Sequence, residues 1–342
     1  MFLAWKEMRY AKLRYVLIIG IITLITALIL SISGLANGLA VDNASAIKSI
    51  PAEAYVVEAA DKHQLERSQL AKADIEAIQR GSLLGMQMIE IKQDGEPLNV
   101  SLFAFDQVSK FMPESNGVSK LEPYEVLADP SLKQQGINIG DSFTYNETTW
   151  TVKGFTKQRY SYGHTPALIT GLDTWQSVFD TYQAVLFSTK ASKDLPASVD
   201  AVQKEDILAN VPGYSAEQGS LTMMVTFLLI ISAIVLATFF YVMTLQKLHQ
   251  YGVLKAIGTK VRILLSALFA QISMLSVVGI AAGVALTYGL TLIIPGGVPF
   301  ELSIGMILFN SGLILLMAWI GSLLSFRSIS SVDPLEAIGS VK

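Results

Sequence analysis

The stretch VLIIGIITLITALILSISGLANGL, residues 16–39, contains no charged side chain and exceeds the roughly 20 residues that span a bilayer as a helix. Three further uncharged apolar stretches lie in the last third of the chain, at 221–245, 263–294 and 302–326. A more polar segment, residues 40–220, separates the first stretch from the other three. The sequence therefore predicts a membrane α-helical fold with four transmembrane helices and one large domain inserted between helices 1 and 2.

The composition agrees with a membrane protein that carries a polar insert. Of the 342 residues, 51% are hydrophobic and only 15% are charged, and the mean hydropathy is +0.47. Soluble domains contain about 25% charged residues. The chain has no cysteine, which excludes disulfides, thiol catalysis and thiolate metal sites.

Basic residues predict how the chain is oriented in the membrane. The segment 1–15 and the loop 246–262 each carry four Lys or Arg residues, whereas the loop 295–301 carries none. Cytoplasmic flanks of membrane helices are enriched in Lys and Arg. We therefore expect a multi-pass cell-membrane protein whose N-terminus, 246–262 loop and C-terminal tail, 327–342, are cytoplasmic, with 40–220 outside the cell.

The segment 1–15 mixes aromatic and basic residues, and Phe2, Trp5 and Met8 fall near helical spacing. This pattern favours a cytoplasmic amphipathic helix on the inner leaflet. A basic flank that only anchors the first span would explain the same residues.

The inserted domain is predicted to be α+β. Apolar or alternating runs typical of strands occur at 54–59, 86–91, 98–105, 143–145, 150–155, 167–170 and 184–188, and helical patterns occur at 68–79 and 172–179. The runs 143–145 and 150–155 are expected to pair as a hairpin across 146–149. The polar segment 190–200 is expected to be a surface loop.

Several function classes are excluded or disfavoured. Residues 40–220 hold 15 basic and 24 acidic residues, a net charge of −9, and nucleic-acid binding requires a basic surface. The chain has no GxxxxGK[ST] phosphate loop and no HExxH or GxSxG motif, and His63, His164 and His249 are scattered. The spans hold no ionisable residue for a proton or ion pathway. We predict a chain without catalytic residues, metal site or intrinsic cofactor.

The loop between spans 2 and 3, QKLHQYGVLKAIGTK at 246–260, predicts a short amphipathic helix. Leu248, Val253, Leu254 and Ile257 fall on one side of it. Gly258 suits the left-handed position that ends many helices. The apolar side of such a helix needs cover, which either a partner protein or the membrane surface would supply.

Three motifs resemble the FtsX/MacB-like ABC transporter permeases, which are four-span subunits with a large extracytoplasmic domain after span 1. GVLKAIG at 252–258 resembles their cytoplasmic loop. SVDPLEAI at 331–338 resembles their DPxEALR-type ending, from which its last positions depart. In the insert, GINIGD at 136–141, TVKG at 151–154 and Pro166 resemble the extracytoplasmic domain.

The N-terminal stretches AWKEMRYAKLRYVLI, 4–18, and SISGLANGLAVDN, 31–43, more closely resemble the permease of Gram-positive haem-efflux exporters. This resemblance implies a type VII ABC exporter, in which a homodimer works beside two copies of a cytoplasmic ATPase and expels haem from the membrane. The ATPase would push on residues that the resemblance places in its contact. These are Gly252, Val253, Leu254, Lys255, Ala256, Ile257, Gly258, Asp333, Pro334, Leu335 and Glu336.

Two other functions remain open. The same architecture serves exporters of other amphipathic cargo, such as a peptide, a lipid-linked molecule or a macrolide. It also serves a non-transporting transmembrane signalling subunit in cell-division relatives.

Candidate haem contacts follow from ligand chemistry. Haem iron accepts Tyr, Met or His as an axial ligand. The segment RYSYGH, 159–164, and the outer end of span 2 supply such groups. The candidates are Tyr160, Tyr162, His164, Tyr214, Met223 and Met224. Interfacial anchoring or plain packing would also explain these residues.

Paired glycines indicate where helices approach closely. Gly34 and Gly38 end the first apolar stretch, and Gly279 and Gly283 lie within the third. Small residues at this four-residue spacing favour helix–helix contact in membranes. We predict helix packing at both pairs, with membrane lipid around the remaining surface.

Overall fold

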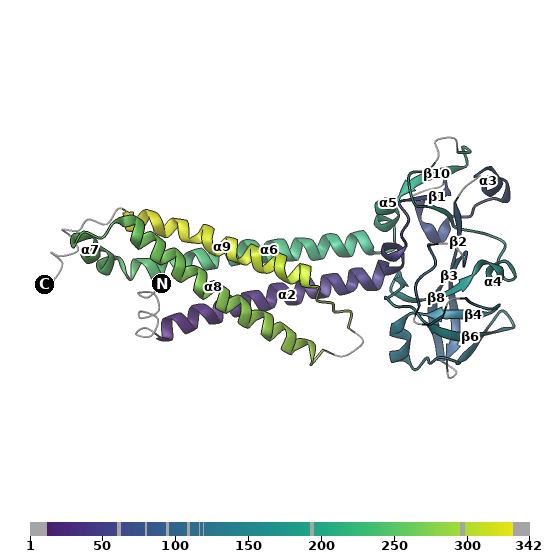
Figure 1. Ribbon diagram of the computed structural model, residues 1–342, viewed down its shortest axis with the longest axis horizontal. Coiled ribbons are helices and arrows are strands. Elements are labelled where there is room, and N and C mark those ends of the chain that lie inside the picture. Colours follow the sequence, from purple (N-terminus) through teal and green to yellow (C-terminus); the bar gives the residue numbers. More distant parts are fainter. Residues whose placement is uncertain are drawn as a thin grey trace. The chain divides into compact units, whose positions relative to one another are not determined.

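The structure, a computed structural model, divides into two compact units (Figure 1). It describes residues 12–59, 63–78, 81–93, 96–107, 110–115, 117–118, 120–191, 195–294 and 298–330. Residues 12–37 and 220–330 belong to a helical unit, and residues 38–219 belong to a unit built around a sheet. Helices α2 (Lys12–Ser49) and α6 (Tyr214–Leu245) contribute residues to both units.

Four helices in the described part of the chain are long and apolar enough to cross a membrane. They are α2, α6, α8 (Val261–Thr291) and α9 (Ile304–Ser330), of which Ile304–Leu323 is the candidate span. A short helix, α7 (Leu248–Ala256), separates α6 from α8 in the sequence. The predicted fold of four membrane helices with a domain inserted after the first is confirmed.

Helix α2 continues beyond the apolar stretch that predicts it. Its last turns belong to the sheet unit, where Ala46 and Ile47 are fully buried. Ala44 has non-helical angles, φ −139° and ψ 17°, which place a kink in these turns. The apolar stretch ends before the helix does because protein, rather than lipid, covers these last turns.

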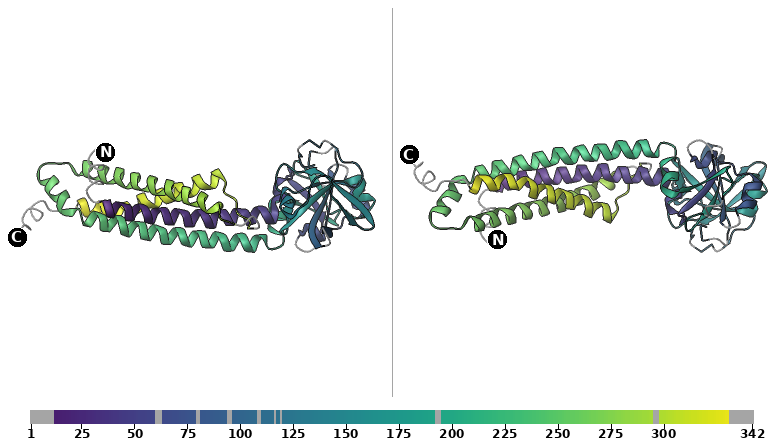
Figure 2. Two further views of the ribbon diagram at one scale, coloured as in Figure 1. Left: turned by 90° about the horizontal axis from the view of Figure 1, so that it is seen from below. Right: turned by 90° about the horizontal axis from the view of Figure 1, so that it is seen from above.

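Inward-facing apolar side chains hold the helical unit together. Ile22 and Ile29 of α2, Phe240 of α6 and Ile272 of α8 are fully buried in one cluster. Ile22 and Ile29 lie two helical turns apart and so share a face. Within this unit α2 and α6 run side by side in both views of Figure 2.

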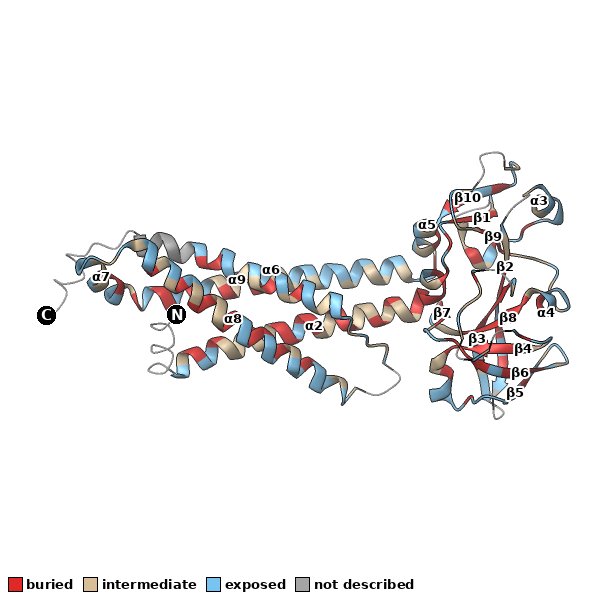
Figure 3. Cartoon of the chain, viewed as in Figure 1, coloured by how far each residue is buried: buried red, intermediate tan, exposed pale blue. Residues whose placement is uncertain are grey.

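Helix α6 is the least covered of the four spans, as its mostly pale-blue ribbon in Figure 3 indicates. Only 17% of its apolar window is buried, against 44% for α8. Phe227, Ile231 and Ile234 are among its exposed side chains. On a membrane helix such side chains contact lipid tails or another membrane protein.

The sheet unit contains ten described strands in one mixed sheet. The strands are β1 (Ala54–Glu58), β2 (Ser82–Gln93), β3 (Glu96–Phe105), β4 (Glu125–Ala128), β5 (Ser142–Tyr145), β6 (Thr148–Phe155), β7 (Ser161–Tyr162), β8 (Thr165–Gly171), β9 (Ala184–Phe187) and β10 (Val199–Gln203). Their order is β10-β1-β9-β2-β3-β8-β4-β6-β5, with β7 paired to β8. Only β3–β8 and β4–β6 are parallel among these pairs. Short helices flank the sheet: η2 (Leu65–Arg67), α3 (Lys72–Ala77), η3 (Pro130–Gln135), α4 (Leu172–Gln176) and α5 (Lys204–Ala209).

The predicted α+β insert is therefore confirmed, with differences in detail. The 143–145 and 150–155 runs pair as a hairpin, and Asn146 and Glu147 in its turn have φ of 47° and 60°. Paired positive φ values are typical of a tight two-residue hairpin turn. The predicted 68–79 helix is shorter, since α3 covers only Lys72–Ala77, and the 190–200 loop ends in β10 rather than continuing as a loop.

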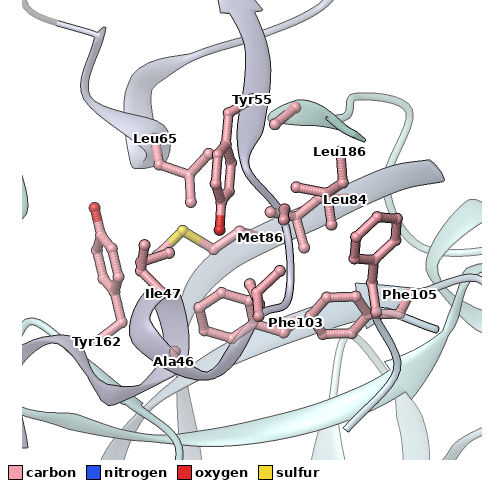
Figure 4. Close-up of a cluster of buried hydrophobic side chains, with 14 of the residues drawn as sticks. Ala46, Ile47, Tyr55, Leu65, Leu84, Met86, Phe103, Phe105, Tyr162 and Leu186 are labelled. Atoms are coloured by element: carbon pink, nitrogen blue, oxygen red, sulfur yellow. The ribbon is translucent and has the colours of Figure 1, made fainter. Parts of the chain in front are cut away.

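The sheet has an apolar core on each face. On β2, Leu84 and Met86 join one core while Ile89 and Ile91 join the other, as strand alternation requires. The first core also contains the end of α2. Figure 4 shows Ile47 among aromatic and aliphatic side chains of the sheet. The last turns of α2 are therefore an integral part of the sheet unit.

Candidate coupling helix and ligand-binding residues

Helix α7 ends just before Gly258, a residue suited to terminate a helix. Gly258 has φ +94°, in the left-handed region that side chains with a Cβ rarely adopt. The N–H of Gly258 donates to Lys255 O at 3.1 Å, and that of Thr259 donates to Leu254 O at 3.0 Å. These bonds use carbonyl groups that the end of the helix leaves unpaired.

The apolar residues of α7 face two different ways. Tyr251 and Gly252 are buried, and Leu254 packs half-buried against the core of the helical unit. Val253 is 39% exposed and Ile257 is 74% exposed. Of the four residues expected on one side, Leu254 therefore packs against the core, Leu248 is half-buried, and Val253 and Ile257 are exposed. The exposed pair, one helical turn apart, leaves a small apolar surface.

Three buried polar side chains, bonded to one another, hold the beginning of α7 in place. Lys247 is 4% exposed, and its Nζ donates to Tyr15 Oη at 2.9 Å and to Gln271 Oε1 at 3.1 Å. Gln271 Nε2 donates to the same Tyr15 oxygen at 2.6 Å. The three side chains join α2, the α6–α7 junction and α8. Sequence reasoning missed this group, although Gln271 is a conspicuous polar residue in an apolar stretch.

The glycines of α8 lie against α2. A Cβ at Gly279 would lie 2.7 Å from Ile22 Cβ, and one at Gly283 would lie 2.5 Å from Thr26 Cβ. Thr23 Oγ1 also donates to Gly279 O at 3.2 Å. The two helices therefore approach too closely for larger side chains at these positions.

The glycines at the end of the first apolar stretch are both buried. A Cβ at Gly34 would lie 2.6 Å from the Phe300 ring, in the segment before α9. Gly38 is buried in the sheet unit.

Two predicted segments lie outside the described residues. They are residues 1–11 of the predicted N-terminal helix and the predicted ATPase-contact residues Asp333, Pro334, Leu335 and Glu336.

Two of the six candidate haem contacts are core residues. Tyr160 and Tyr162 are 3% and 1% exposed, and both rings meet Phe103 edge-on. The Tyr162 hydroxyl donates to Glu66, and the Tyr160 N–H donates to Asp129. Burial raises the pKa of both phenols. Since metal ligands bind in deprotonated form, these surroundings disfavour iron ligation by either phenol.

His164 is held in a tight turn between β7 and β8. Tyr162 pairs with Thr165, so Gly163 and His164 form a two-residue turn. Their φ values are 57° and 62°. The turn projects the imidazole toward the end of α2 and the beginning of α6.

Both nitrogens of His164 are occupied by carboxylates. Nδ1 lies 3.0 Å from Asp42 Oδ2, and Nε2 lies 2.9 Å from Glu217 Oε1. Arg159 pairs with Asp42 at 2.8 Å, and Asn43 Nδ2 donates to Glu217 Oε2 at 3.2 Å. Burial lowers the His164 pKa, but its bonds to the two carboxylates and their charges raise it above its usual value overall. Neither nitrogen points to open space where iron would bind.

The remaining three candidates lie on α6. Tyr214 is half-buried, with Lys48 Nζ 5.1 Å from its ring centroid. Met223 and Met224 are each 56% exposed. The structure thus puts two candidates in the sheet core, one in an ion cluster and three along α6. Groups of three or more His, Asp or Glu able to hold a metal are absent from the described residues.

Comparison with known proteins adds independent information. Residues 222–334 match the FtsX-like permease C-terminal family, a range that begins in α6 and includes α7 and α8. A putative hemin transport system permease protein HrtB from Staphylococcus haemolyticus is 32% identical over 353 residues, covering 99% of each chain. The Staphylococcus epidermidis protein of that name is 33% identical over 347 residues, covering 98% of this chain and 99% of the relative. The chain belongs to the HrtB family of FtsX-like permeases.

A less similar full-length relative of this HrtB-family chain and a partial structural match were also found. An uncharacterized ABC transporter permease from Mycobacterium tuberculosis is 23% identical over 351 residues, covering 99% of each chain. The extracellular domain of the transporter YknZ from Gram-positive bacteria matches 44% of this chain and 99% of its own, with 8% identity and a TM-score of 0.33.

Membership of the HrtB family makes the chain a multi-pass ABC-type membrane permease. Four apolar helices agree with this assignment. The matched relatives are permeases, and the sequence of this HrtB-family member has no phosphate-loop motif.

Proposed function

We propose that this HrtB-family chain is the permease subunit of an ABC exporter that moves haem out of the membrane, driven by a separate cytoplasmic ATPase. The observation that carries the proposal is the full-length identity of 32–33% to proteins named as hemin transport permeases. The sequence contains no phosphate loop, which supports ATP hydrolysis by a separate subunit.

The proposed contact with the ATPase is α7 together with the tail residues Asp333–Glu336. Support comes from the exposed apolar pair Val253 and Ile257, which an ATPase surface would cover. The buried bonds of Lys247 would carry a push on α7 into α2 and α8. A push on α7 would therefore reach the membrane helices without any chemistry in this chain.

The proposed assembly holds two copies of this chain and two ATPases. The low burial of α6 supports it, because a second copy and lipid together would cover the exposed side chains. The basic residues of 1–15 and 246–262 favour an orientation with α7 and both termini in the cytoplasm and the sheet unit outside.

For the haem contacts, we retain Tyr214, Met223 and Met224. Both methionines are exposed on a membrane helix, where a haem dissolved in lipid can reach their sulfur atoms. Tyr160, Tyr162 and His164 are weaker candidates because each already has a structural role in the sheet unit.

Reconstitution tests the proposal. The chain and its ATPase would be placed together in nanodiscs, and ATP hydrolysis measured with haemin, a macrolide or an amphipathic peptide. Stimulation by haemin alone, with ATP-dependent release of haemin to an acceptor protein, supports haem export. Stimulation by another compound would assign another cargo. If no compound alters ATP hydrolysis in the nanodiscs, and cells that lack this gene divide abnormally, the result would favour signalling.

A further inference from the structure

A kink interrupts α2 inside the sheet unit, and the local sequence gives no reason for it. Ala44, at the kink, has φ −139° and ψ 17°, and it is fully buried. Sharp kinks arise at proline, at glycine or serine pairs, or where another group enters the backbone hydrogen-bond ladder. Residues 39–48, LAVDNASAIK, contain neither proline nor glycine, and alanine is the best helix former. The cause must therefore lie in the residues that pack against α2.

The turn between β7 and β8 supplies that cause. In a regular helix each carbonyl oxygen accepts the N–H of the residue four positions later. The carbonyl oxygen of Asn43 accepts the N–H of Gly163, in the turn, at 2.8 Å. The carbonyl oxygen of Ala40, which would pair with the Ala44 N–H in a regular helix, accepts Lys48 Nζ at 3.4 Å. Donors from outside the backbone ladder therefore reach carbonyl groups beside the kink.

Two buried serines tie the same part of α2 to β7. The N–H of Ser161 donates to Ser45 Oγ at 2.9 Å, and the two hydroxyl oxygens lie 3.3 Å apart. Ser45 and Ser161 are only 5% and 1% exposed. The sheet unit therefore holds α2 directly before and directly after Ala44. Tertiary contacts with β7 and its turn impose the kink.

The kinked form also leaves polar atoms unsatisfied. Asn43 Oδ1 and Arg159 Nε are buried and have no hydrogen-bond partner among the described residues. Such atoms raise the free energy of the conformation that contains them. Asn43 Nδ2, in contrast, donates to Pro212 O and to Glu217 Oε2, both at 3.2 Å, so the kink is bonded to the beginning of α6 as well. The kinked form thus combines bonds that hold it with costs that a second form would relieve.

We propose that the Ala44 kink is a joint with two states. In the first state, the β7–β8 turn holds the kink, as the structure shows. In the second, the turn withdraws, the Gly163 N–H leaves Asn43, and residues 40–48 form a continuous helix. One backbone bond replaces another, which keeps the two states close in free energy and lets binding elsewhere shift their populations. The joint goes beyond the proposed function, because it requires neither a particular cargo nor an ATPase.

A reversible disulfide tests the joint, since the chain has no cysteine of its own. Ser45→Cys/Ser161→Cys puts two sulfur atoms where the hydroxyl oxygens are 3.3 Å apart, which favours bond formation. The matched control is Ser142→Cys/Thr151→Cys in the β5–β6 hairpin, where the hydroxyl oxygens are 3.1 Å apart. Amide hydrogen exchange in residues 160–164 is measured by mass spectrometry on the full-length chain in nanodiscs, oxidised and reduced.

We expect the disulfide to slow exchange in residues 160–164 at least about tenfold relative to the reduced protein, because the turn can no longer withdraw. The control disulfide should change this exchange less than about twofold. The reduced protein is the control for folding. Equal exchange in the oxidised and reduced forms would overturn the joint. A cysteine pair that does not oxidise would overturn it as well, since the kinked form would then not be populated.

A single substitution tests the second state. Ser45→Ala removes the acceptor of the Ser161 N–H and favours a continuous helix. It should speed exchange in residues 160–164 about fivefold, the effect of one lost hydrogen bond, without speeding exchange in residues 44–48. Ser142→Ala is the control and should change neither segment.

Faster exchange of both segments in Ser45→Ala would show fraying of the end of α2 in place of a switch, and would contradict the second state. These measurements use neither haem nor ATPase. A failure of the joint is therefore distinguishable from a failure of the proposed haem export.

Discussion

Nε2 of His164 lies 2.9 Å from Oε1 of Glu217, and this contact joins the β7–β8 turn to the beginning of α6. Asp42, near the end of α2, holds the other ring nitrogen. An imidazole donates from both nitrogens only when it is protonated. The contact therefore depends on pH.

The first prediction concerns this pH dependence. The folded protein raises the His164 pKa, so its contribution to stability is fully present below the unfolded value of about 6.5 and disappears as pH rises through the folded pKa. The side chain is 38% exposed, so screening limits the contribution to about 1 kcal/mol. Thermal unfolding in detergent should show wild type exceeding His164→Gln most at pH 5.5–6, with the difference shrinking toward pH 8.5.

The control for this prediction is His63→Gln. His63 also pairs with one carboxylate, Asp200, at 2.9 Å, but it does not join α2 or α6 to the sheet. A difference between wild type and His164→Gln that grows with pH would contradict the assignment.

The second prediction tests the surface of α7. Ile257→Asp should uncouple ATP hydrolysis from export while leaving folding intact, because Ile257 is 74% exposed and an aspartate there costs little without a partner. Gln250→Asp, exposed on the same helix, is the control. Gly252 and Leu254 are unsuitable positions, since Gly252 is buried and Leu254 packs half-buried against the core of the helical unit. Hydrolysis and export would be measured with the reconstituted pair, and unchanged export in Ile257→Asp would contradict the coupling role.

The third prediction concerns the buried lysine. Lys247→Met leaves the bond between Tyr15 and Gln271 intact, so it should cost only about 1 kcal/mol. Gln271→Leu removes an acceptor from a buried ammonium group and should cost about 3 kcal/mol. Melting temperatures in detergent give the ranking. A larger loss for Lys247→Met would show that Gln271 does not stabilise the charge.

The fourth prediction uses two glycines of α8. Gly283→Ala places a Cβ 2.8 Å from the Thr23 carbonyl oxygen and should destabilise the protein by about 2 kcal/mol. Gly289→Ala, on the same helix with open space around it, should be neutral or slightly stabilising. Equal melting temperatures for the two variants would show that α2 and α8 do not need this close approach.

The fifth prediction separates the haem candidates. Tyr162→Phe should leave the haemin absorption spectrum of the purified protein unchanged, because the Tyr162 ring is buried in the sheet core. Met223→Leu/Met224→Leu should alter that spectrum, since leucine keeps the apolar surface and removes the sulfur. A changed spectrum for Tyr162→Phe, with an unchanged spectrum for the methionine variant, would instead identify Tyr162 as the ligand.

Patterns that extend over many residues were predictable from sequence. The four spans are long, so their apolar runs stand out, and the 143–155 hairpin shows clear alternation on both sides of its turn. Strand β4 has only four residues, Glu125–Ala128, which is too few to show a period. Its place between β8 and β6 comes from tertiary pairing that no local pattern records.

The contacts of individual side chains were the least predictable part. Tyr160 and Tyr162 have suitable chemistry for iron, but the sequence does not say which way each side chain points, and both point into the core. The partners Asp42 and Glu217 lie 122 and 53 residues from His164 in the sequence. Only the fold brings such distant residues into hydrogen-bond distance.

The end of α2 determines where the chain can be cut. Ala46 and Ile47 are fully buried among sheet residues, and Lys204 Nζ donates to the carbonyl oxygens of Lys48 and Ile50. A water-soluble fragment that starts at β1 would lack the last turns of α2 and would expose aromatic residues of the core such as Phe103. A fragment that starts near residue 40 would keep these turns, and would be the proper starting material for crystallising the sheet unit alone.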